Sequence, residues 1–274
     1  MAVLYLGDCL QKMKCIADRS VDLIICDLPF GCLSINGNNK ISPEKAKEIW
    51  GEWAEKKLQS YGAGCSWDIK IDLVEFWKQI RRIRKNDHTP CLMFCTTKYG
   101  FDLYNSNPKE FRYDLVWDKG RGVSFLSANR MPMRSHEMIY VFSKAGAKYN
   151  RIDIEGDFKE WKKEPNSVRK NQVYTSEIKR TTNGGDGKRC ALSVIQINQK
   201  ASYQMKGKHP TEKPIDLYKF LIERYSKEGD VVCDPTFGSG NSGFASKELK
   251  RKYIGIEKDN NFYWKFVGRS IGSN

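Results

Sequence analysis

The sequence has 274 residues, of which 40% are hydrophobic, so the chain can bury one large core and still supply a smaller module. This composition excludes wholesale disorder, and no apolar run reaches the roughly 18 residues that a membrane span needs. The formal net charge of +14 predicts a polyanionic partner, with nucleic acid ahead of an anionic membrane surface; a generic basic protein is the alternative.

The beginning of the sequence and its cysteines predict a cytoplasmic protein without a metal. The first residues, MAVLYLGD, lack the basic start and apolar stretch of a signal peptide. The nine cysteines form no C-x-x-C pair, and Cys26, Cys91, Cys95 and Cys233 lie inside apolar runs, as small core residues do. Three histidines without ligand spacing do not predict a zinc site.

Predicted elements alternate from the first residues onward. Residues 3–8 favour a short strand, and residues 9–16 carry apolar side chains at helical spacing. Residues 21–26 form an apolar run with the length and β-branched content of a buried strand. This strand–helix–strand order is typical of a parallel sheet.

A short motif, Asp27, Leu28, Pro29 and Phe30, follows the buried strand at once. Because Pro29 has no N–H and a fixed φ, the chain must leave the sheet there. Asp27 and Phe30 are therefore expected at the carboxyl edge of the sheet, where open α/β folds bind ligands. An acceptor beside a stacking ring suits a planar base that carries an amino group. The alternative is an ordinary turn in which Asp27 caps the next helix.

Residues 32–67 differ from their surroundings and predict an insertion. Ser42 and Pro43 have the pattern of a helix start, with a capping side chain before a proline at the first helical position. Trp50 and Trp53 are three residues apart, which places both on one helix face. We expect an inserted helix that docks through its tryptophans; a mobile loop that covers the site or touches DNA is the alternative.

The next part of the chain returns to the α/β pattern. Residues 73–83 predict an amphipathic helix, and residues 91–95, 113–117 and 137–142 predict strands.

Between residues 144 and 208 the strong apolar runs stop. This stretch has fifteen Lys or Arg against seven Asp or Glu, a net charge of +8, and aromatic residues are interleaved with the charges. Basic groups contact phosphates, while aromatic and polar side chains approach bases. We expect a small recognition module rather than a solvated, partly disordered linker, with candidate DNA-binding residues Lys162, Lys163, Arg169 and Lys170.

The C-terminal part again alternates. The pattern predicts a helix over 215–225, a strand over 230–233, a helix to about 252, a strand over 253–257, and a last helix from about 261.

A glycine-rich loop lies between the predicted strand and helix. Gly238, Gly240 and Gly243 match G-x-G-x-x-G, and Glu257 ends the next strand 19 residues beyond Gly238. This pattern alone would fit NAD, because an acid at that place bonds ribose hydroxyls. Asp234 favours another ligand, since a carboxylate before the glycines repels a pyrophosphate and attracts a cation such as the ammonium of a methionine moiety.

Three motifs together resemble the S-adenosylmethionine-dependent DNA amino-methyltransferases. They are D-L-P-F at 27–30, H-P-T-E-K-P at 209–214 and D-P-T-F-G-S-G at 234–240. Their order, with the catalytic motif first and the cofactor motif last, is that of the β class. The resemblance covers residues 3–31, 67–143 and 209–268.

The resemblance implies an α/β, Rossmann-like methyltransferase fold with a largely parallel central sheet and a circularly permuted motif order. The permutation makes physical sense, because a sheet whose chain ends meet at its surface tolerates being cut elsewhere. The implied domains are a catalytic half at 1–143 with the insertion at about 32–67, a target-recognition region at 144–208 and a cofactor-binding half at 209–274.

The resemblance also implies the cofactor, S-adenosylmethionine, and the residues around it. Glu257 would bind the ribose hydroxyls, and Lys213 and Pro214 would border the same pocket. The cofactor-binding set is Asp234, Pro235, Phe237, Gly238, Gly240, Glu257, Lys213 and Pro214, and the catalytic set is Asp27, Leu28, Pro29 and Phe30.

The implied reaction is methyl transfer to the N6 amino group of an adenine that is flipped out of double-stranded DNA. Asp27 and the backbone carbonyl of Leu28 would each accept an amino hydrogen, so that the nitrogen lone pair points at the sulfonium methyl group. Phe30 would stack on the base. Leu28 and Phe30 replace the proline and tyrosine that are commoner in the family. The aspartate at the first position of the motif, Asp27, resembles the motif of the adenine enzymes. This resemblance favours N6-adenine over N4-cytosine as the target.

Other functions stay open at this point. A non-catalytic nucleic-acid-binding protein on the same fold is one alternative, and RNA or protein nitrogen as the acceptor is another. A Cys91 nucleophile that attacks cytosine carbon 5 is rejected, because Cys91 opens an apolar run. A homodimer and a companion restriction enzyme are compatible with the sequence; a membrane or metal partner is not expected.

Overall fold

The computed structural model describes residues 2–30, 47–48, 51–53, 69–123, 128–155, 188–199 and 212–271. Lys162, Lys163, Arg169 and Lys170 lie outside the described residues, as does most of the predicted insertion at 32–67. The chain divides into two compact units, Arg151–Leu192 and the remainder. In the smaller unit, β6 (Ile154–Glu155) pairs antiparallel with β7 (Lys188–Arg189).

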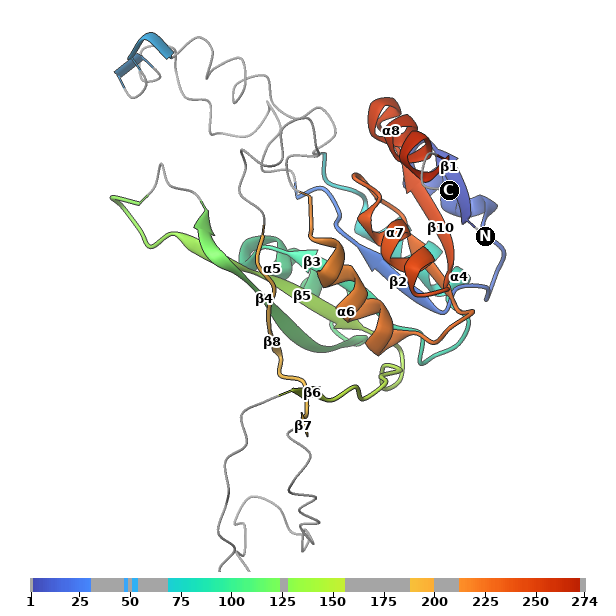
Figure 1. The fold of residues 1–274 in the computed structure, drawn as a ribbon. Coiled ribbons are helices and arrows are strands. Elements are labelled where there is room, and N and C mark those ends of the chain that lie inside the picture. The colour runs from blue at the N-terminus through green and yellow to red at the C-terminus, as the bar shows by residue number, and fades with distance from the viewer. Residues whose placement is uncertain are drawn as a thin grey trace, which may run out of the picture. The chain divides into compact units, whose positions relative to one another are not determined.

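The larger unit is built on an eight-stranded sheet with the order β1-β10-β9-β2-β3-β5-β4-β8 (Figure 1). The first five strands in that order run parallel, β5 runs antiparallel to both of its neighbours, and β8 is parallel to β4. This confirms the largely parallel sheet. The strands are β1 (Ala2–Leu6), β2 (Leu23–Cys26), β3 (Cys91–Cys95), β4 (Phe111–Val123), β5 (Arg134–Phe142), β8 (Val194–Gln196), β9 (Val231–Asp234) and β10 (Lys252–Glu257).

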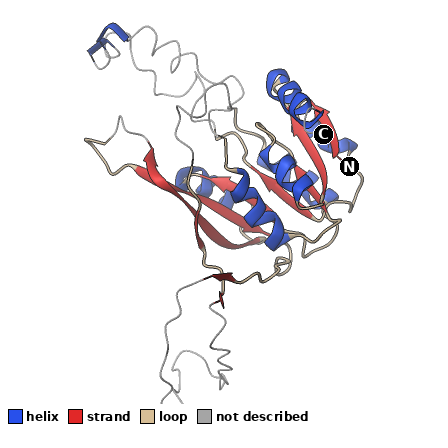
Figure 2. Cartoon of the chain, viewed as in Figure 1, coloured by secondary structure: helices blue, strands red, loops and turns tan. Residues whose placement is uncertain are grey.

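Helices cover both faces of the sheet (Figure 2). Successive residues of β2 point to opposite faces: Ile24 packs in the same cluster as α1, α4 and α5, and Ile25 in the same cluster as α6, α7 and α8. The central strands are apolar throughout because a strand that is buried on both faces has no polar side. The helices are α1 (Cys9–Lys12), α4 (Leu73–Ile83), α5 (Thr97–Ser106), α6 (Ile215–Tyr225), α7 (Asn241–Glu248) and α8 (Asn260–Ile271).

The two ends of the chain meet in neighbouring strands. β1 pairs in parallel with β10, from Ala2 opposite Tyr253 to Leu6 opposite Glu257. The sheet therefore runs from the C-terminal strands β9 and β10 into the N-terminal strand β1, as expected for the permuted motif order. The N and C labels lie close together in Figure 1.

The structure departs from the predicted elements in four ways. β4 and β5 extend beyond the strands predicted at 113–117 and 137–142. The helix expected over 9–16 is α1 followed by a tight 3-10 turn, Met13–Cys15. Helix α5 was not predicted, since its only buried side chains besides a glycine are Tyr99 and Leu103. β8 lies in the expected recognition region yet pairs with β4 of the main sheet. None of the helices in the described ranges is long and apolar enough to cross a membrane.

Candidate active site

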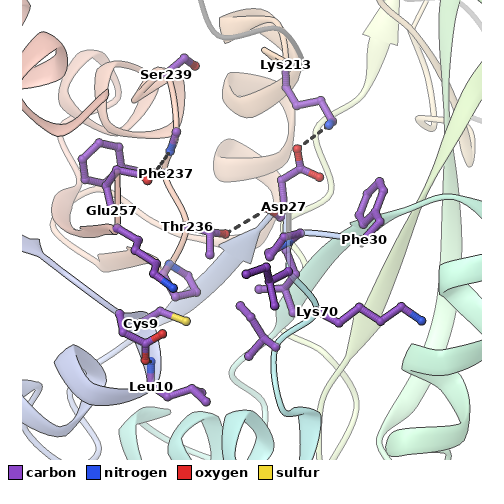
Figure 3. A pocket seen from close by; sticks show the side chains of 18 of the residues that line it. Cys9, Leu10, Asp27, Phe30, Lys70, Lys213, Thr236, Phe237, Ser239 and Glu257 are labelled. Atoms are coloured by element: carbon purple, nitrogen blue, oxygen red, sulfur yellow. Dashed lines mark hydrogen bonds and ion pairs between the residues drawn. The ribbon is translucent and has the colours of Figure 1, made fainter. Parts of the chain in front are cut away.

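A cavity of about 320 Å³ opens at the carboxyl ends of four parallel strands. Its walls are the residues that follow β2 (27–30), β9 (235–239) and β1 (7–10), together with Glu257 at the end of β10 (Figure 3). The motif near the N-terminus and the glycine loop near the C-terminus thus face one space. This confirms that Asp27 lies at the carboxyl edge of the sheet.

Asp27 has one carboxylate oxygen in an ion pair and one without a partner. Its Oδ2 is 2.5 Å from Lys213 Nζ, whereas its Oδ1 is buried and has no hydrogen-bond partner in the described part of the chain. The Thr236 hydroxyl donates to the backbone carbonyl of Asp27 at 3.1 Å and so ties the motif to the glycine loop. Burial raises the pKa of Asp27, and the Lys213 ammonium opposes that rise.

Lys213 has a second carboxylate neighbour that the sequence did not reveal. Glu137 Oε2, from β5, is 3.2 Å from Lys213 Nζ, and Glu137 Oε1 is 2.5 Å from Lys119 Nζ of β4. Burial disfavours ionisation of Glu137, but Lys213 and Lys119 outweigh it and hold the pKa of Glu137 below its usual value. Both lysines are almost fully buried. In the sequence, Glu137 is recognisable only as an acid directly before the apolar run at 138–142.

The rest of the N-terminal motif forms one wall of the cavity. The Leu28 side chain is buried in the core, while the residue also lines the cavity beside Pro29 and Phe30. The Phe30 ring lies 5.0 Å from the Tyr99 ring, centroid to centroid, with 36° between the planes. Phe30 is half-buried, so part of its ring surface stays accessible to a planar ligand.

Asp234 does not line the cavity, contrary to its assignment to the cofactor. The carboxylate is fully buried: its Oδ1 accepts from the Thr236 N–H at 3.0 Å and its Oδ2 from the Ser242 hydroxyl at 2.6 Å. Burial raises the pKa of Asp234 to about 7. Its place in the structure is to hold the glycine loop against α7. Gly240 and Pro214 are likewise absent from the cavity wall.

Glu257 does face the cavity, at the end of β10. Its Oε2 accepts from the Gly238 N–H at 2.8 Å and its Oε1 from the Asp259 N–H at 2.7 Å. Because a carboxylate has about four acceptor positions, each oxygen can still accept from a hydroxyl group of a ligand. Burial raises the pKa of Glu257, which these backbone donors oppose.

Phe237 packs against α8 and also contributes to the cavity wall. Its ring centroid lies 5.0 Å from that of Phe266. Of the predicted site residues, the cavity brings together Asp27, Leu28, Pro29, Phe30, Lys213, Pro235, Phe237, Gly238 and Glu257. The cavity wall also includes motif residues that were not assigned to the site, Glu212, Thr236 and Ser239. Residues outside the motifs complete it, namely Gly7, Asp8, Cys9, Leu10, Ile69, Lys70, Ile71, Asp72, Glu137, Tyr218 and Lys258.

Comparison with known proteins places this arrangement in a family. The model of the DNA methylase family of N6 and N4 methyltransferases matches residues 21–266. The type II methyltransferase M.HinfI of Haemophilus influenzae is 25% identical over 264 residues, which is 93% of this chain and 64% of that protein's length.

Two solved structures share the fold. PvuII DNA methyltransferase, described as cytosine-N4-specific, gives a TM-score of 0.63 at 16% identity. The match covers all of this chain and 87% of the PvuII chain. The M1.HpyAVI–SAM complex gives a TM-score of 0.56 at 19% identity, over 98% of this chain and 99% of its own.

Proposed function

The chain belongs to the DNA methylase family of N6 and N4 methyltransferases, and from this membership we propose that it methylates the N6 amino group of a flipped-out adenine in double-stranded DNA, with S-adenosylmethionine as the methyl donor. The observation that carries the proposal is the unpartnered, buried Oδ1 of Asp27. It lies in the same cavity as Phe30, the glycine loop and Glu257.

The cavity has the chemistry that S-adenosylmethionine requires. Its volume of about 320 Å³ is in the range of small-molecule sites. Glu257 has free acceptor positions for ribose hydroxyls, and Phe237 and Pro235 supply apolar wall. When bound, the cofactor supplies an electrophilic methyl group on a sulfonium. The complex of M1.HpyAVI with SAM supports this assignment.

Asp27 and Leu28 supply the acceptors for the target amino group. A buried carboxylate oxygen without a partner is costly, and an amino hydrogen of the base would satisfy it. The Leu28 carbonyl would accept the second hydrogen, and Phe30 would stack on the base. These contacts would draw the nitrogen lone pair out of the ring plane, so that positioning and electrostatics provide the rate enhancement.

The same acceptors would also suit the N4 amino group of cytosine, which is the second candidate. The similarity of fold to PvuII DNA methyltransferase, which is described as cytosine-N4-specific, supports this second candidate. The preference for adenine rests on the aspartate at position 27, which resembles the adenine enzymes. A homodimer and a companion restriction enzyme belong to the same proposal, and sedimentation of the purified chain tests the first of these.

The deciding experiment is incubation of the chain with duplex DNA and S-adenosylmethionine that carries a labelled methyl group. The DNA is then digested, and its nucleosides are separated. Labelled N6-methyl-2′-deoxyadenosine supports the proposal, whereas labelled N4-methyl-2′-deoxycytidine moves the activity to the second candidate. Parallel reactions with RNA and protein, and with an Asp27→Ala variant, serve as controls. A wild-type chain that binds the cofactor but labels no DNA of mixed sequence contradicts the proposal.

A further inference from the structure

Four charged side chains form a buried chain of ion pairs that begins at Asp27. Lys213 Nζ lies 2.5 Å from Asp27 Oδ2 and 3.2 Å from Glu137 Oε2. Glu137 Oε1 lies in turn 2.5 Å from Lys119 Nζ. The side chains of Lys213 and Lys119 are 4% and 6% exposed, so water contributes little to their stabilisation.

The charges of these four side chains alternate in sign, and their sum is zero. Two carboxylates and two ammonium groups follow one another, so each inner member lies between two opposite charges. Burial would lower the pKa of Lys213, but Asp27 and Glu137 raise it above its usual value. Removing one member would leave a buried charge without compensation, which is far more costly than losing a surface pair.

The members come from four places in the sequence, and the fold holds each of them. Asp27 follows β2, and Lys213 lies shortly before α6. Glu137 on β5 is paired opposite Trp117 on β4, and the Lys119 ammonium lies 5.2 Å from the Trp117 ring centroid. The antiparallel β4–β5 pair therefore fixes Glu137 and Lys119 relative to each other.

This geometry determines which oxygen of Asp27 is free. Lys213 occupies Oδ2, and the Thr236 hydroxyl binds the backbone carbonyl of the same residue at 3.1 Å. Of the two Asp27 carboxylate oxygens, Oδ1 is the one without a hydrogen-bond partner among the described residues. A carboxylate that could rotate would present either oxygen, whereas this one presents Oδ1 as the oxygen without a donor.

We propose that Lys213 and Glu137 are positioning residues for Asp27: Glu137 holds the Lys213 ammonium, and that ammonium orients the carboxylate that receives the target amino group. The assignment differs from the sequence-based one, in which Lys213 borders the cofactor. It rests on the proposed function, since the reacting group is taken to be the amino group of a DNA base.

The test compares kcat for methyl transfer with the Kd for S-adenosylmethionine in the full chain. In Lys213→Met and in Glu137→Gln, kcat is expected to fall roughly ten- to hundredfold, the range for losing one charge-assisted hydrogen bond, while the cofactor Kd changes little. Because Glu137 acts through Lys213, adding Glu137→Gln to Lys213→Met should cost no further activity.

Arg84→Met is the matched control. Arg84 Nη1 lies 3.0 Å from Glu110 Oε2, and the two side chains are 9% and 11% exposed. Arg84 forms a bridge with Val21, which precedes the amino end of β2 and so lies away from the cavity. Arg84→Met is therefore expected to lower stability while leaving kcat unchanged.

Three results overturn the proposal. One is a Lys213→Met variant with a raised cofactor Kd and a wild-type kcat, which would return Lys213 to the cofactor. Another is a loss of kcat that Arg84→Met reproduces at equal loss of stability. The third is a kcat of the double variant that is lower than the kcat of Lys213→Met. If Lys213→Met does not fold, the isosteric Glu137→Gln carries the test through its kcat and Kd. Failure of the proposed function is separate, because it appears as a wild-type chain that labels no DNA.

Discussion

Two carboxylates at the ends of neighbouring strands differ sharply in what they can bind. Asp234 ends β9 with both oxygens occupied by the chain itself, and no part of it is exposed. Glu257 ends β10 and lines the cavity with acceptor positions to spare. Equal positions in the strand–loop pattern therefore leave the Asp234 carboxylate enclosed by the chain and the Glu257 carboxylate facing the cavity.

Substitution of these two acids should separate their roles. Glu257→Gln is expected to weaken binding of S-adenosylmethionine by about 1–3 kcal/mol, the usual cost of removing one partner of a buried hydrogen bond. Asp234→Asn should change the affinity less, because its side chain does not reach the cavity wall. Titration calorimetry measures both. A larger loss in Asp234→Asn than in Glu257→Gln would show that Asp234 meets the cofactor.

The raised pKa of Asp234 predicts how stability depends on pH. The carboxyl ionises near pH 3.8 in the unfolded chain and near 7 in the folded one, because burial opposes the charge. The folded state therefore holds this proton more tightly, so the contribution of Asp234 to stability is full below the unfolded value and is lost as pH rises towards 7. The loss is at most about 1.4 kcal/mol per pH unit.

Urea unfolding at about pH 5 and about pH 8 measures this effect. The wild-type chain should lose more stability between these two values than Asp234→Asn, whose side chain does not titrate. Equal losses in the two proteins would place the ionisation of Asp234 below this range.

Asp27→Ala is expected to abolish methyl transfer, because it removes the acceptor of the target amino group. Cofactor binding should stay largely intact, since Glu257 and the glycine loop remain. Radiolabel transfer measures the first, and equilibrium dialysis with S-adenosylmethionine measures the second. Turnover at the wild-type rate would show that the catalytic assignment is wrong.

At the scale of elements, the glycine loop is shaped by the entry into α7. Gly240 lies just before the helix with φ +79°, in the left-handed region that other residues avoid. A Cβ at this position would come within 2.0 Å of the Phe266 ring of α8. The motif therefore requires glycine here for both its conformation and the close approach of a second helix.

Gly240→Ala is expected to destabilise the chain by more than the roughly 1–2 kcal/mol of the left-handed conformation alone, because Phe266 must also move. Gly268→Ala is the control. Gly268 is an exposed residue of α8 with open space around it, so alanine there should be neutral or stabilising by up to about 1 kcal/mol. Urea unfolding measures both, and equal stabilities would contradict the close packing of α7 and α8.

At the scale of the whole molecule, charge and chain connectivity have separate consequences. The net charge is +14, and residues 144–208 supply +8 of it. The sheet is continuous from β9 through β10 to β1, so the α/β core draws on both ends of the chain. Lys162, Lys163, Arg169 and Lys170 belong to none of these strands, so a change to them should alter DNA binding without unfolding that core.

Substituting Lys162, Lys163, Arg169 and Lys170 by glutamine should weaken binding to cognate and non-cognate DNA alike. Each phosphate contact that is lost should reduce the slope of log affinity against log salt concentration by about 0.9. Fluorescence anisotropy over a salt series measures that slope. If the slope stays at the wild-type value, phosphate contacts lie elsewhere. The insertion at residues 32–67 is then the next segment to test.

Much of the fold followed from local pattern. The apolar runs that became β2, β3, β9 and β10 were predicted because a strand buried on both faces must be apolar throughout. The proline after Asp27 located the strand end and with it one wall of the site. Helix α5 escaped prediction because much of its surface faces water and its apolar spacing is weak.

The sequence by itself determined the family, the sheet, and the meeting of Asp27 with the glycine loop, because motifs that end parallel strands must share one edge. Only the tertiary structure decided how the charges are paired. It buried Asp234 behind the loop and brought Glu137 and Lys119 to Lys213. Such contacts join residues that are far apart in the chain, and an ion pair leaves no periodicity in the sequence from which its partner can be inferred.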